Sequence, residues 1–141
     1  MQIKNQIMGK RNVRQGMATE EIACMWLRRY GFLCIEPIET PWRIIRHGGR
    51  VVGATPEKKV SGDFTAIEPS TGRHVHVEVK SRDRDTLRFS DIEAHQRQAM
   101  DEKVAAKALC LVLWVKSPAE VACYKWPIQG FGPGKSLKWG G

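Results

Sequence analysis

The apolar run ALCLVLWV, from Ala108 to Val115, constrains the fold more than any other segment of this 141-residue chain. A near-continuous run of this length is typical of a strand that is buried on both faces. The chain is long enough for one domain of ordinary size. We therefore expect a single sheet with helices packed on it.

Two helices are expected beside this strand. Residues 18–30 have a helical pattern with acidic side chains in the first turn and basic ones in the last, and Gly31 follows where a helix end favours a positive φ. Ser90 and Glu93 have the S-x-x-E spacing of a capping box, which predicts a second helix over residues 90–105.

The remaining strands are separated by turn signals, among them the sequence His47-Gly48-Gly49. One helix then precedes the sheet and the other crosses between its later strands, which predicts a mixed α/β domain. The strands are expected at residues 32–38, 43–46, 50–54, 60–67, 73–80 and 121–126.

The ends of the chain differ from this central domain, which we place at residues 16–129. Residues 1–15 are basic without periodicity, and residues 130–141 are basic and rich in glycine, so we expect a flexible arm and a flexible tail. No apolar stretch is long enough to span a membrane, and the N-terminus lacks the apolar centre of a secretory signal. A cytoplasmic location is therefore expected.

Composition indicates which kind of partner the protein attracts and which kinds of site its cysteines can form. The net charge of +8 predicts attraction to polyanions such as nucleic acids. The cysteines are widely spaced and lie in apolar stretches, which favours buried free thiols over zinc ligands or disulfides. They are Cys24, Cys34, Cys110 and Cys123.

The candidate catalytic residues lie in the segment VSGDFTAIEPSTGRHVHVEVKSR. On a strand, alternate side chains share a face, so Glu78 and Lys80 point to one side while the valines between them point to the other. A short loop returns Asp63, at the head of the preceding strand, toward the same region. Three ionisable groups can therefore converge.

This arrangement suits phosphodiester hydrolysis. Carboxylate oxygens from Asp63 and Glu78 are ligands that Mg²⁺ prefers, with Mn²⁺ as a substitute. Such a cation polarises a phosphate and lowers the pKa of a bound water. Lys80 can orient that water or offset charge in the transition state.

A structural interpretation stays open, because the same residues can form a salt-bridge ladder on a solvent-facing strand. The triplet Glu57-Lys58-Lys59 shows that E-x-K also occurs here without a strand. His74 and His76 share the face of Glu78, and we interpret both as exposed strand histidines rather than ligands.

Asp63 with Glu78-Val79-Lys80 matches the pattern of the PD-(D/E)xK nuclease superfamily, and the chain resembles RecU-type Holliday junction resolvases within it. The resemblance covers residues 14–115. Its points follow in order: Gly16-Met17 before a helix with Glu20, Thr40-Pro41, Gly62-Asp63-Phe64, Glu78-Val79-Lys80, Phe89, His95-Gln96 and the strand ending at Val115.

The resemblance implies a restriction-endonuclease-like fold, a single mixed β-sheet flanked by helices. It implies that Asp63 and Glu78 bind the metal together with the carbonyl of Val79, and that Lys80 is the catalytic lysine. Glu20 would reach the site from the first helix, and its register with Ala23 and Leu27 allows it to face the sheet. Gln96 would be an accessory residue of the active site.

The expected partner is DNA, in particular four-way junctions, and a homodimer would supply two equivalent sites. RecU proteins carry a projecting stalk, for which this shorter chain has only residues 43–59 available. A bacterial or phage origin is expected. The basic residues expected to contact phosphates are Lys10, Arg11, Arg14, Lys58, Lys59, Arg82, Arg84 and Arg88.

Two alternatives remain from the sequence. One is a repair or restriction-type nuclease of the same superfamily that cuts duplex or flap DNA. The other is a non-catalytic nucleic-acid-binding module, which would bind with a steep salt dependence and without a metal.

Overall fold

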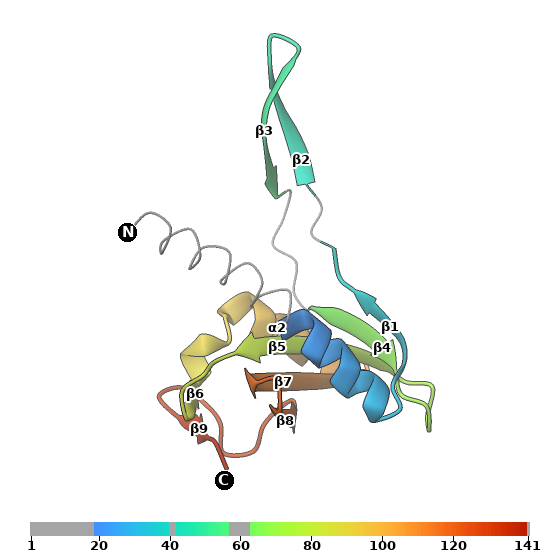
Figure 1. Cartoon of the computed structure of the whole chain (residues 1–141), viewed down its shortest axis with the longest axis vertical. Helices are drawn as coiled ribbons and strands as arrows, with labels where there is room; N and C mark the ends of the chain where they lie inside the picture. Colours follow the sequence, from blue (N-terminus) through green and yellow to red (C-terminus); the bar gives the residue numbers. More distant parts are fainter. Residues whose placement is uncertain (1–18, 40–41, 57–62, 141) are drawn as a thin grey trace.

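Strand β7 (Leu109–Ser117) contains the predicted apolar run, and its residues 109–115 are all buried. It lies inside a five-stranded sheet with the order β1-β4-β5-β7-β8 (Figure 1). The structure, a computed structural model, describes residues 19–39, 42–56 and 63–140. The other strands of this sheet are β1 (Leu33–Pro37), β4 (Phe64–Ile67), β5 (His74–Ser81) and β8 (Glu120–Lys125).

The sheet is mixed. Strands β5 and β7 run parallel, while the pairs β1–β4, β4–β5 and β7–β8 are antiparallel. A parallel pair needs a crossover connection, and this one contains helix α2 (Ala94–Ala105). The predicted α/β class and the crossing helix are therefore confirmed, as is β8 as an edge strand.

A helix over residues 19–29 covers one face of the sheet (blue in Figure 1). Its fully buried Ala23 and Leu27 join a core cluster with Val75 and Val77 of β5 and with alternate leucines of β7. The helix ends before Gly31, whose φ of +86° is the positive value that the sequence predicts.

Helix α2 covers the opposite face. Its fully buried Met100 joins a second cluster with Cys110, Val112 and Trp114, the residues of β7 that alternate with those of the first cluster. Helices on both faces explain why β7 is apolar along its whole length. No helix in the described part of the chain is long and apolar enough to cross a membrane.

The start of the second helix differs from the sequence prediction. Ser90 lies in a single 3₁₀ turn, η1 (Phe89–Asp91), and α2 begins at Ala94. The capping box is formed by Glu93 and Gln96, where the backbone N–H of Glu93 donates to Oε1 of Gln96 over 3.0 Å. The S-x-x-E spacing therefore predicted the region of the helix start correctly but the wrong capping pair.

The tail also differs from prediction, because it is paired and packed. Strand β9 (Ser136–Lys138) pairs antiparallel with β6 (Thr86–Arg88). Leu137 packs against the second cluster, and the ring of Trp139 meets that of Trp114 edge-on with centroids 5.0 Å apart. These apolar contacts give the glycine-rich tail a fixed place that its composition did not predict. The expected N-terminal arm, residues 1–15, lies outside the described residues.

The predicted hairpin about His47-Gly48-Gly49 is confirmed. Strands β2 (Trp42–His47) and β3 (Arg50–Pro56) form a separate antiparallel ribbon that projects away from the five-stranded sheet (Figure 1). The two turn glycines both have positive φ. The ribbon leaves four large apolar side chains exposed, Ile44, Ile45, Val51 and Val52.

The second cluster provides a test of the fold. We expect Met100→Ala to lower the free energy of unfolding by about 2–5 kcal/mol, because it leaves a cavity under α2. Met25 is 68% exposed and is the matched control, for which Met25→Ala should change stability by less than about 0.5 kcal/mol. Urea unfolding at equilibrium measures both variants, and equal midpoints would show that α2 does not pack as described.

Candidate active site

The proposed site lies on the face of β5 that α2 covers. His76, Glu78 and Lys80 alternate along this face beside Cys110, Val112 and Trp114 of β7. The two faces of β5 were predicted correctly, with the valines in the first cluster. The solvent exposure of the polar face was predicted wrongly. Of its four polar side chains only His74 is exposed, while His76 and Glu78 are fully buried and Lys80 is 9% exposed.

Asp63 reaches β5 just beyond the end of β4. Its backbone N–H donates to the carbonyl of Val77, and its carboxylate Oδ2 accepts from the N–H of Val79 over 2.6 Å. The ladder between β4 and β5 ends at the Phe64–Val77 pair, so the backbone of Val79 faces Asp63 instead of a strand. The predicted approach of Asp63 to the E-x-K triplet is therefore confirmed.

Lys80 is held by helix α2. Its Nζ donates to Oε1 of Gln96 over 2.6 Å, the same oxygen that accepts the N–H of Glu93. Gln96 thus links the first turn of α2 to the end of the lysine side chain. The sequence placed Gln96 near the site through resemblance alone, although its E-x-x-Q spacing from Glu93 is a local signal for the same position.

His76 and Glu78 form a buried pair that the sequence did not predict. His76 Nε2 lies 3.2 Å from Glu78 Oε1. The other two polar atoms of the pair, Nδ1 of His76 and Oε2 of Glu78, are buried and have no hydrogen-bond partner among the described residues. An ionisable side chain in this position is costly unless something else satisfies it.

Burial shifts the pKa values of the site in opposite directions. Desolvation raises the pKa of Asp63, against the Val79 N–H that lowers it, and the nearby charge of Glu78 raises it further. Desolvation lowers the pKa of Lys80, although the charges of Glu78 and Asp63 oppose this. Both shifts disfavour the charged forms, so the site holds its charges at a cost in stability.

Oxygen atoms are the ligands that this site offers to a metal. Asp63 and Glu78 supply carboxylates, and the carbonyl of Val79 points to the same side of β5 as its N–H, toward Asp63. Within residues 19–39, 42–56 and 63–140, no group of three or more His, Cys, Asp or Glu side chains forms a metal site. Two carboxylates with a carbonyl fit Mg²⁺ or Mn²⁺, and the orphaned Oε2 of Glu78 is an atom that such a cation would satisfy.

Glu20 is exposed on the helix that covers the other face of the sheet. Ala23 and Leu27, with which the sequence places it in register, are both buried, and the predicted role of Glu20 at the site stays a prediction. Its charge nevertheless acts on the site, where it contributes to the raised pKa of Asp63.

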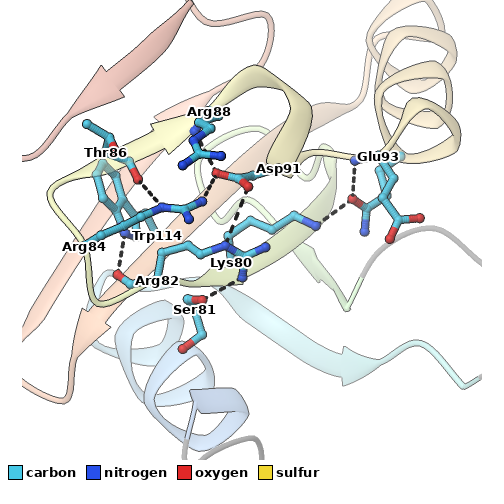
Figure 2. A network of polar contacts seen from close by, with 10 residues as sticks. Lys80, Ser81, Arg82, Arg84, Thr86, Arg88, Asp91, Glu93 and Trp114 are labelled. Carbon is cyan, nitrogen blue, oxygen red and sulfur yellow. Dashed lines mark hydrogen bonds and ion pairs between the residues drawn. The ribbon is translucent and has the colours of Figure 1, made fainter.

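Three of the eight predicted phosphate-contacting residues lie in the described structure. Figure 2 shows Arg82, Arg84 and Arg88 around Asp91, next to Lys80. Arg84 Nη2 lies 2.6 Å and Arg82 Nε 3.8 Å from this carboxylate, which also accepts the backbone N–H of Arg88. The remaining five, Lys10, Arg11, Arg14, Lys58 and Lys59, lie outside the described residues.

Asp91 therefore holds the guanidinium groups of Arg82 and Arg84 in place without covering them. The side chains of Arg82 and Arg84 remain 37% and 38% exposed, so both can still meet a phosphate. The fold holds them at the end of β5, where the carbonyl of Arg82 accepts the indole N–H of Trp114 over 2.9 Å.

Two surface hollows in the described part of the chain lie away from the carboxylates. A hollow of about 610 Å³ lies between the first helix and the turn from β7 to β8 and is mostly apolar, with Trp26, Tyr30 and Val121 in its wall. A smaller one of about 350 Å³ lies beside η1 and is lined by Arg88, Arg97 and other residues.

The raised pKa of Asp63 predicts a pH-dependent gain in stability for Asp63→Asn. A carboxyl whose pKa is higher in the native state holds its proton more tightly there, so the native state loses stability as pH rises through the interval between 3.8 and the native pKa. The amide removes this loss and can still accept the N–H of Val79. We expect a gain on the order of 1 kcal/mol at pH 7 that shrinks toward pH 4, measured by urea unfolding.

Asp91→Asn is the control of opposite sign. Burial raises the pKa of Asp91, but the hydrogen bonds from Arg84 and the N–H of Arg88 outweigh it and leave the pKa lowered. Its neutralisation should therefore lower stability at pH 7. A loss of stability at pH 7 in both variants would contradict the desolvated state of Asp63.

No protein-family model matches the chain, and no curated protein matches it.

Proposed function

We propose that this protein is a metal-dependent DNA endonuclease with a restriction-endonuclease-like fold, and that it acts as a Holliday junction resolvase of the RecU type. The observation that supports this best is the 2.6 Å hydrogen bond from the N–H of Val79 to Asp63. It brings the aspartate against the Glu78-Val79-Lys80 triplet, the arrangement on which phosphodiester hydrolysis in the PD-(D/E)xK superfamily depends.

The residues divide the chemistry between them. Asp63, Glu78 and the carbonyl of Val79 would hold Mg²⁺, which when bound supplies positive charge to stabilise a phosphate under attack. Lys80 presents an ammonium group whose position is set by Gln96. Because its pKa is lowered by burial, Lys80 is better suited to give up or share a proton than a lysine in water.

Arg82 and Arg84 extend the site along a path for the DNA backbone. They follow Lys80 closely in the chain, and Asp91 holds their guanidinium groups in place. A guanidinium that is already oriented loses less entropy when it binds a phosphate. The proposed partner is therefore DNA. The proposal also includes a homodimer, a bacterial cytoplasmic location, and a bacterial or phage origin for the protein.

The β2–β3 ribbon supports junctions as the substrate. It projects beyond the sheet, where it can act as the short stalk for which only residues 43–59 were available (Figure 1). Arg43, Arg46 and Arg50 are exposed on it together with its apolar side chains. A basic ribbon with exposed apolar groups suits unpaired or distorted DNA better than a regular duplex.

The central test is cleavage of a labelled four-way junction beside a linear duplex and a flap, each with Mg²⁺ and with EDTA. We expect Glu78→Gln to lower cleavage by at least about 100-fold while junction binding is retained, because the cation loses a carboxylate. Asp63→Asn should behave in the same way. Glu68→Gln is the matched control, since Glu68 lies in the turn after β4, where its carboxylate contacts Thr71 and Arg73.

Paired symmetric nicks in the junction alone would support a resolvase. Equal cutting of duplex or flap would keep the metal site but assign the protein to the repair or restriction-type nucleases. Binding without cleavage in the presence of Mg²⁺, or near-normal turnover of Glu78→Gln, would overturn the proposed site and favour a non-catalytic binding module.

The ribbon generates a second prediction. In one variant, residues 44–54 are replaced by an Asn-Gly turn that joins Arg43 to its strand partner Thr55. We expect the ratio of junction to duplex affinity to fall at least about tenfold, or about 1.4 kcal/mol. Electrophoretic mobility shifts measure both affinities.

A second variant keeps the ribbon but replaces Arg43, Arg46 and Arg50 by glutamine. It separates the effect of the ribbon's shape from that of its charge. Lost phosphate contacts should weaken binding to the junction and to the duplex together, and reduce the salt dependence of binding. An unchanged affinity ratio after removal of the ribbon would show that junction preference arises elsewhere.

A further inference from the structure

His76 is the one fully buried histidine beside the proposed metal ligands in the described residues. Its side chain has no exposed area, and that of Glu78 is 1% exposed. The 3.2 Å contact from Nε2 to Oε1 is the hydrogen bond that the described structure gives to the Glu78 side chain. Across the parallel pair with β7, His76 lies beside Cys110 and Glu78 beside Val112, so apolar groups surround both.

The pair is poorly satisfied as a purely structural element. Among the described residues, Oε2 of Glu78 and Nδ1 of His76 both lack a hydrogen-bond partner, and each such buried group costs about 1–3 kcal/mol. Apolar side chains at both positions would pack against Cys110 and Val112 without this cost. The geometry therefore indicates that one oxygen of Glu78 is kept for a group that the described residues do not supply.

We propose that His76 is a positioning residue for Glu78, a role that rests on the proposed metal-dependent function. In this role the imidazole donates its Nε2–H to Oε1 of Glu78 and so fixes the rotation of the carboxylate. Oε2 then remains available to a divalent cation. Carboxylates that bind metals are in turn held by hydrogen bonds, and the loss of such a partner lowers metal affinity by about 10–100-fold.

The same strand contains a matched control. His74 lies on the same face of β5, two residues before His76, and is exposed. It differs from His76 in burial and in having no hydrogen bond to Glu78 among those described. Any effect of an imidazole on the general charge of the site would therefore appear in both histidine variants, whereas positioning of Glu78 would appear only at His76.

The experiment measures Mn²⁺ binding to the full chain without DNA, from the electron paramagnetic resonance signal of the free ion. We expect His76→Leu to weaken binding by about 10–100-fold, and His76→Gln, which keeps an N–H donor, to recover much of it. His74→Leu should bind as the unmodified protein does. Thermal unfolding is recorded for each variant, and His76→Met replaces His76→Leu if the latter fails to fold.

The outcomes separate this inference from the proposed function. If the unmodified protein binds Mn²⁺ and Glu78→Gln does not, but His76→Leu binds normally, the positioning role is wrong and the metal site stands. Normal binding by His76→Leu with a lower melting temperature would likewise assign His76 a structural role only. If the unmodified protein binds no Mn²⁺, or Glu78→Gln has no effect, the proposed function and this inference both fail.

Discussion

The parallel pairing of β5 with β7 is the constraint on which the candidate site depends. Its register sets Glu78 beside Val112 and Lys80 beside Trp114, so a carboxylate and an ammonium group are held among apolar neighbours. Helix α2 then closes over them, because the crossover that a parallel pair requires passes over this face. The removal of water from these groups follows from the topology of the sheet and not from any property of the charged residues.

This burial creates a cost that other parts of the fold offset. The charged forms of Asp63 and Lys80 are both disfavoured, and Oε2 of Glu78 has no partner among the described residues. Two apolar clusters, one on each face of the sheet, provide the stabilisation. Asp91 shows the opposite arrangement, a carboxylate stabilised by arginines at the surface. Burial of ionisable groups at a cost in stability, as at Asp63 and Lys80, is expected where a protein keeps such groups ready for a reaction.

The proposed endonuclease would thus combine a rigid site with more adaptable DNA contacts. Asp63 is held by the backbone of Val79 and Lys80 by Gln96, while Glu78 contacts His76. Arg82 and Arg84 are oriented but remain partly exposed, and the β2–β3 ribbon projects from the body of the fold (Figure 1). Specificity for a DNA structure would then come from the shape of the contacts, while the cutting site stays the same for any phosphodiester that reaches it.

Apart from β6, β9 and the start of α2, the sequence by itself determined the helices and strands and the alternation along β5. The apolar run of β7, Gly31 after the first helix and the His47-Gly48-Gly49 turn are local signals, and each predicted its element correctly. Local spacing also predicted that Asp63 returns to the E-x-K triplet, because a short hairpin leaves it little choice.

Only the tertiary structure decided what is buried and what is paired. His76 and His74 have the same position in the pattern of β5, yet one is enclosed under α2 and the other faces solvent. The packing of Trp139 on Trp114 depends in the same way on elements far apart along the chain. Burial is a property of the whole fold, and a side chain's neighbours in sequence do not report which element will cover it.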